Sequence, residues 1–101
     1  MISAYYLAFR IAEVGDCEAR YEALMACIEE ATAGRWWLEP ASFVVFSSEL
    51  NAAALAQDIS AVLDLDHDIA VLGKTEFKVV KIIGACSDSD IFELVPFAER
   101  I

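Results

Sequence analysis

The feature that most constrains the fold is a change in hydrophobic period near the start of the chain. Residues 5–12 alternate between two faces, which is typical of a β-strand. One face would carry Tyr5, Leu7, Phe9 and Ile11, and the other Tyr6, Ala8, Arg10 and Ala12. Residues 17–33 then place apolar side chains at helical spacing, which predicts an amphipathic helix. Asp16 suits the N-cap of this helix, and Gly34 suits the position just after its end.

Further strands and helices are expected along the rest of the chain. The expected strands cover residues 35–38, 42–47, 69–72 and 76–83, and the second helix runs from Asn51, its N-cap, to Leu63. Ser87 and Asp90 have the spacing of a capping box, which predicts a short helix that Pro96 should end. The order β-α-β-β-α-β predicts an α+β, ferredoxin-like sandwich with an extra C-terminal strand and a short helix. We expect one domain over residues 1–101, since that length suits a single core.

Charge and apolar content limit the classes of function. Seventeen acidic side chains against seven basic ones give a formal net charge of -10, so the chain would repel nucleic acid. An apolar fraction of 58% excludes a disordered protein. With both helices on one face of the sheet, the opposite face would expose Tyr6, Arg10 and apolar neighbours. This pattern predicts a homodimer, with another protein as an alternative partner.

The chain shows no export or membrane signal. Its first residues lack the basic region and cleavage site of a signal peptide, and no apolar stretch could span a bilayer. Cys17, Cys27 and Cys86 form no C-x-x-C pair, so neither a disulfide framework nor a zinc site is indicated. We therefore expect a reduced cytoplasmic protein that needs no cofactor.

Four bulky or basic side chains are candidates for an interface or a ligand site. Trp36 and Trp37 would point to opposite faces of a strand. One of them then belongs to the core, and the other anchors an interface or stacks on a ligand, with the interface favoured. Arg10 and Arg35 are rare positive charges in an acidic chain. They could form an anion pocket, but pairing with carboxylates across a dimer is favoured.

An acidic turn around His67 is the candidate for metal or acid–base chemistry. Asp64, Asp66 and Asp68 surround this histidine in the sequence. A metal site, or a general base paired with a carboxylate, is one interpretation. A helix-to-strand turn in which aspartates accept backbone N–H groups is the favoured one.

Several short motifs resemble one known family. They are the strand Tyr5–Ile11, the helix containing Tyr21–Leu24, the pair Trp36–Trp37 followed by Ser42–Val45, and the stretch from Asn51 to Val71. Together they resemble the small ferredoxin-like proteins related to the second CRISPR adaptation protein, with the SinR-type proteins grouped near them. The resemblance spans residues 5–83 and does not extend to residues 84–101.

The resemblance implies a metal-dependent nuclease only where an aspartate ends the first strand. In members with that activity, one such aspartate from each protomer holds a divalent cation, which suits a hard metal and phosphodiester hydrolysis. The matching position in this chain is Arg10, and a guanidinium cannot coordinate Mg²⁺. A nuclease would therefore need ligands from Glu13, Asp16 or the turn at residues 64–68.

The favoured function is a non-catalytic, dimeric interaction or regulatory module, and no catalytic residue is assigned. The first alternative is a metal-dependent endonuclease or toxin-like RNase, as the resemblance implies. The second is a small-ligand-binding module that uses Trp36 or Trp37.

Overall fold

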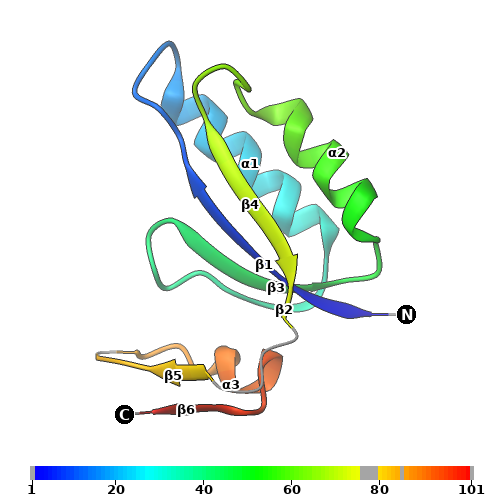
Figure 1. Ribbon diagram of the computed structural model, residues 1–101, viewed down its shortest axis with the longest axis vertical. Coiled ribbons are helices and arrows are strands. Elements are labelled where there is room, and N and C mark those ends of the chain that lie inside the picture. The colour runs from blue at the N-terminus through cyan, green and yellow to red at the C-terminus, as the bar shows by residue number, and fades with distance from the viewer. Residues whose placement is uncertain (1, 76–79, 85, 101) are drawn as a thin grey trace.

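The computed structural model describes residues 2–75, 80–84 and 86–100. Its main sheet contains β1 (Ser3–Arg10), β2 (Thr32–Trp37), β3 (Phe43–Ser48) and β4 (Ile69–Lys74). The spatial order is β2-β3-β1-β4, and neighbouring strands are antiparallel. Helices α1 (Cys17–Ala31) and α2 (Ala52–Val62) lie side by side on one face of the sheet (Figure 1). This arrangement confirms the α+β, ferredoxin-like sandwich predicted from the sequence.

The predicted N-caps of both long helices are confirmed. An Asp16 carboxylate oxygen accepts from the backbone N–H of Ala19 at 3.0 Å, and the Asn51 side chain does the same for Ala54 at 2.8 Å. Each bond satisfies a donor that the first helical turn leaves free.

The predicted end of the first helix is wrong. α1 stops at Ala31, and Thr32 begins β2 directly while its hydroxyl donates to the Ile28 carbonyl at 2.7 Å. Gly34 therefore lies inside β2, with a φ of +105°. It occupies the stretch between Thr32 and Trp36 where the register with β3 shifts, and an irregular strand uses the conformational freedom of glycine there.

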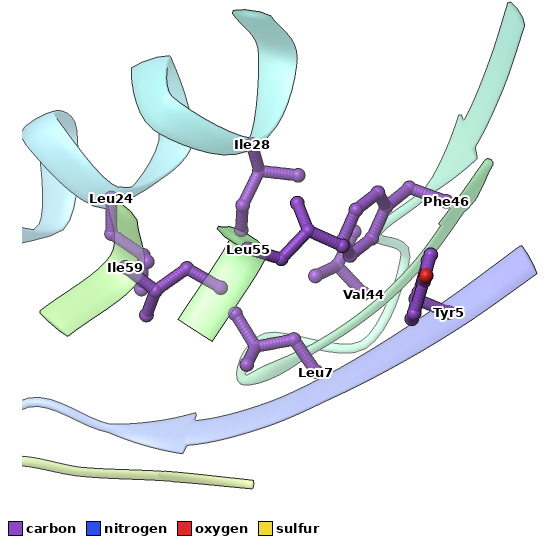
Figure 2. Close-up of a cluster of buried hydrophobic side chains, with 8 residues drawn as sticks. All are labelled: Tyr5, Leu7, Leu24, Ile28, Val44, Phe46, Leu55 and Ile59. Carbon is purple, nitrogen blue, oxygen red and sulfur yellow. The ribbon is translucent and has the colours of Figure 1, made fainter. Parts of the chain in front are cut away.

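The main core lies between the sheet and the two helices. Figure 2 shows eight buried side chains converging from β1, β3, α1 and α2. They are Tyr5, Leu7, Leu24, Ile28, Val44, Phe46, Leu55 and Ile59. Phe9 and Ile11 pack against this cluster, so the face predicted from the alternation in residues 5–12 is confirmed. The buried Tyr5 hydroxyl donates to the Leu50 carbonyl at 2.9 Å, which satisfies its polar end.

The C-terminal segment forms a small second unit beside the main sheet. It contains β5 (Val80–Ile82), α3 (Asp90–Leu94) and β6 (Ala98–Arg100), and β5 pairs with β6 in parallel (Figure 1). Of the strand predicted over residues 76–83, the structure confirms the part in β5, and residues 76–79 lie outside the described residues. β6 was not predicted, because three residues are too few to show a period.

The capping box predicted for the last helix is wrong. Ser89 is the N-cap of α3 and makes no side-chain capping bond. The Ser87 hydroxyl instead donates to Glu39 at 3.0 Å. The helix ends at Leu94, before Pro96, as expected.

The C-terminal segment also corrects the expectation that the whole second face of the sheet is open. α3 packs on β2 and β3. A second buried cluster joins Trp37 and Val45 of the sheet to Ile91, Leu94, Val95 and Ala98 of the segment. Among the described residues, the C-terminal segment therefore covers the β2–β3 half of this face and leaves the β1–β4 half open.

Candidate interaction surface

The sheet surface that the described residues leave uncovered is the β1–β4 half on the side away from the helices, which we call the open half-face. It consists of Tyr6, Ala8 and Arg10 on β1 and Ile69, Val71 and Gly73 on β4. The side chains of Ala70 and Leu72 pack into the main core, so Ile69 and Val71 point the other way. These two residues leave 55% and 52% of their surfaces exposed. An apolar strip therefore runs beside the free edge of the sheet.

The outer edge of β4 also presents backbone hydrogen-bonding groups. β4 is the last strand of the main sheet, and no strand among the described residues pairs with its outer side. On the inner side, Thr75 N donates to the Ala4 carbonyl at 3.0 Å. Because hydrogen-bonded positions alternate along an antiparallel pair, the N–H and C=O groups of Ala70, Leu72 and Lys74 point outward.

The composition of β4 does little to prevent further pairing. Edge strands commonly carry charges, prolines or bulges that block association with another strand. β4 has no charged side chain before Lys74 and contains no proline. Its edge is therefore a suitable template for an added strand.

The acidic turn that leads into β4 is held by a buried ion pair. Asp68 accepts from Arg20 Nε at 2.9 Å, and the Asp68 side chain is fully covered. The same carboxylate accepts from the backbone N–H groups of Ala12 at 2.8 Å and Asp64 at 2.9 Å. Burial alone would raise the pKa of Asp68, but these hydrogen bonds and the Arg20 charge lower it to about 2. Asp68 thus fixes the segment after β1, helix α1 and the turn relative to one another.

The other polar groups of the turn bind one another. His67 Nδ1 lies 3.0 Å from an Asp64 carboxylate oxygen, and Asp66 N donates to the other at 3.1 Å. These two contacts lower the pKa of Asp64. Within the described ranges, no three His, Cys, Asp or Glu side chains gather so as to hold a metal ion. The contacts are those of a turn in which aspartates accept backbone N–H groups.

The two candidate arginines lie in different environments. Arg10 is exposed at the end of β1, where it belongs to the open half-face and pairs with Ile69 of β4. Arg35 donates to Asp90 at 2.8 Å within the same chain. We had expected Arg35 to pair with a carboxylate across a dimer. Its partner is instead Asp90 of the same chain.

The two tryptophans occupy opposite faces of β2, as predicted. Trp36 packs against the main core on the helix side, and Trp37 belongs to the cluster formed with the C-terminal segment. The open half-face therefore contains neither tryptophan. Tyr6 lies at its inner border, where it packs against the second buried cluster and its ring stacks on Phe43 with centroids 6.1 Å apart.

Glu39 has a structural role that the sequence did not indicate. Its carboxylate accepts from the backbone N–H groups of Ser87 at 2.8 Å and Asp88 at 2.9 Å. The N–H groups of Asp88 and Ser87 lower the pKa of Glu39 to about 2. Glu39 thereby ties the turn between β2 and β3 to the C-terminal segment. A glutamate before a proline gives no sign of partners so distant in the sequence.

The fold defines an α+β protein of the ferredoxin-like class. A scan against family models finds no match for the chain, and a search of curated proteins finds none either. The resemblance to proteins related to the second CRISPR adaptation protein therefore stays a prediction. No helix among the described residues is long and apolar enough to cross a membrane.

Proposed function

We propose that this protein is a non-catalytic self-association module that dimerises by pairing the β4 edges of two copies. The observation that carries the proposal is the uncovered β4 edge, where outward backbone groups lie beside the exposed Ile69 and Val71. Two such edges related by a two-fold axis join into one continuous antiparallel sheet. Main-chain hydrogen bonds supply the attraction, and the apolar strip is removed from water.

The hydrogen-bonding pattern limits the register of this pairing. Asp68 N already donates to the Asp64 carbonyl at 2.7 Å, so the usable outward donors are those of Ala70, Leu72 and Lys74. With the two-fold axis at Val71, Ala70 of each copy pairs with Leu72 of the other. Lys74 N then reaches the Asp68 carbonyl of the second copy, and all three donors are used.

Side chains favour this register over the one centred on Leu72, which uses the same donors. With the axis at Val71, the two Val71 side chains face each other at a closely spaced, non-hydrogen-bonded position. Lys74 also meets the acidic turn of the second copy, where Asp66 is exposed. With the axis at Leu72, Lys74 would lie opposite Ala70, and the apolar pair at Val71 would be lost.

Sedimentation velocity across the micromolar range tests the proposal. We expect the wild-type chain to dimerise, and Val71→Lys to weaken the dimer at least about tenfold, since like charges directly opposite each other are destabilising. This substitution makes the chain less negative, so increased overall repulsion cannot explain a loss of dimer.

Ile83→Lys is the matched control, because Ile83 is 82% exposed and lies on the C-terminal segment. It should leave the dimer intact, and circular dichroism should show both variants folded. A wild-type chain that stays monomeric, or a V71K variant that dimerises like the wild type, would refute the proposal.

A further inference from the structure

A groove of about 760 Å³ lies between α1 and α2, the two helices that run side by side in Figure 1. Its floor consists of small or aliphatic, partly covered side chains, which are Ala23, Cys27 and Ala31 of α1 and Val62 of α2. The three floor residues of α1 recur every four positions, so they form one row along that helix. Such a row of small side chains lets another helix approach closely.

Three carboxylates border this groove, and no basic side chain lines it. Glu30 lies on α1, Asp58 on α2 and Glu49 in the turn before α2. All three are exposed, and none forms an ion pair within the part of the chain that the structure describes. Burial raises the pKa of the Cys27 thiol, and the charges of Asp58 and Glu30 raise it further. Carboxylates from both helices therefore act on one point of the floor, which suits a partner with an apolar face flanked by positive charges.

The walls of the groove favour a helical partner over an extended one. Both walls are helices, whose inner backbone N–H and C=O groups are already paired within each helix. An extended segment laid here would cover its own main-chain groups without giving them partners, which the β4 edge by contrast can offer. A helix brings its backbone groups already paired and needs to bury only side chains.

None of the helices that the structure describes is basic. Arg20 is the one basic residue of α1, and it pairs with Asp68. Helices α2 and α3 contain no lysine or arginine. Packing a helix of a second copy into the groove would bring carboxylates together. A second copy therefore does not suit this surface.

We propose that the groove between α1 and α2 binds a basic, amphipathic helix of a different protein. The apolar stripe of that helix covers the floor, and its Lys or Arg side chains reach Glu30, Glu49 and Asp58. The aliphatic stems of these basic side chains lie along the groove, while their charged ends stay at the rim. Pairing of two copies through β4 leaves both grooves free to bind.

A dye-labelled, capped peptide of Ala, Leu and Lys is a suitable probe, with about 18 residues so that it can form a helix. Its leucines follow helical spacing, and its lysines flank them. Two control peptides keep the charge and change one property each. One has a central proline, which breaks the helix, and the other has serine in place of leucine. We expect saturable binding of the probe by fluorescence anisotropy in about 0.15 M salt, and at least about tenfold weaker binding of both controls.

Substitutions in the protein test the acidic rim. The rim variant is Glu30→Gln, Glu49→Gln and Asp58→Asn. The matched control is Glu18→Gln, Glu22→Gln and Glu29→Gln, at exposed positions of α1 that do not line the groove. We expect the rim variant to bind the probe at least about fivefold more weakly, because three ion pairs are lost. The control loses the same charge, and its affinity should stay within about twofold of the wild type.

Circular dichroism should show both triple variants folded, since every substituted side chain is exposed. In nuclear magnetic resonance, the backbone amides of Ala26 and Ala61 on the two walls should shift when the probe binds, while that of Val71 on β4 should not. Absence of saturable binding, an equal loss in the two triple variants, or equal affinity of either control peptide would overturn the proposal. Shifts confined to residues outside the groove would also overturn it.

Discussion

The Tyr6 ring lies over Gly73 on the open half-face, and substituting the two residues tests how closely β1 and β4 pack there. A Cβ built on Gly73 would lie 2.5 Å from one ring carbon of Tyr6 and 2.6 Å from the next and from the hydroxyl oxygen. The Tyr6 ring stacks on Phe43 with an interplanar angle of 24°, so it cannot turn aside without losing that contact. Ala8 and Val71, the next pair along the two strands, border this position.

The expected effect of Gly73→Ala depends on the presence of the Tyr6 ring. In the wild-type chain the added methyl group overpacks the site, which should cost about 1–3 kcal/mol of unfolding free energy. Gly73 is not among the glycines with positive φ, so alanine fits its backbone. In a Tyr6→Ala background, the same substitution should stabilise the strand by about 0.5–1 kcal/mol, the usual advantage of alanine over glycine. The coupling between the two positions should therefore be about 1.5–4 kcal/mol.

Urea unfolding of the wild type, G73A, Y6A and the double variant measures this coupling. The transitions should be followed by circular dichroism, at a protein concentration where sedimentation shows a monomer, so that dimerisation does not contribute. Equal cost of G73A in both backgrounds, to within about 0.5 kcal/mol, would refute the reasoning, because independent sites are additive to that precision.

Two further predictions concern charge. The unfolding free energy should be constant at neutral pH and fall as the pH drops from about 5 to about 2. Asp68 and Glu39 have folded-state pKa values of about 2, below their unfolded values of about 3.9 and 4.3. Their stabilisation is therefore complete above the unfolded values and lost as the pH falls through the folded ones, and a flat profile in urea titrations would contradict this. Separately, Lys74→Glu and Asp66→Lys should each weaken the dimer severalfold in sedimentation experiments, and the double variant should restore it. A double variant weaker than either single one would exclude the register centred on Val71.

The parts of the fold with strong local signals could be predicted from the sequence. The alternation in residues 5–12 identified the buried face of β1, and Asp16 and Asn51 marked the starts of α1 and α2. These signals are reliable because each depends on neighbours within a few residues. The predicted role of Gly34 at the end of the helix was wrong, because a glycine just after a helical pattern also suits an irregular strand. The helix already ends at Ala31, where Thr32 is its C-cap.

The parts that depend on distant contacts could not be predicted. Glu39 and Ser87 are 48 residues apart, and nothing local connects them. Residues 69–72 are apolar on both faces of the predicted strand, and this pattern is as typical of a central strand as of an edge strand with an exposed apolar face. Only the spatial order of the sheet places β4 at an edge and so turns Ile69 and Val71 into a candidate surface.

The C-terminal segment narrows the surfaces through which the 58% apolar fraction of the chain could favour dimerisation. If the whole second face were open, two sheets could stack face to face, but α3 and its neighbours occupy the β2–β3 half. Association is then confined to the open half-face and the β4 edge. The open half-face contains one charged residue, Arg10, in a chain with a net charge of -10. Two copies that meet through it keep their carboxylates apart, whereas contact through the acidic helix exteriors would bring like charges together. The same edge that offers hydrogen bonds therefore also avoids the repulsion between carboxylates that contact through the helix exteriors would cause.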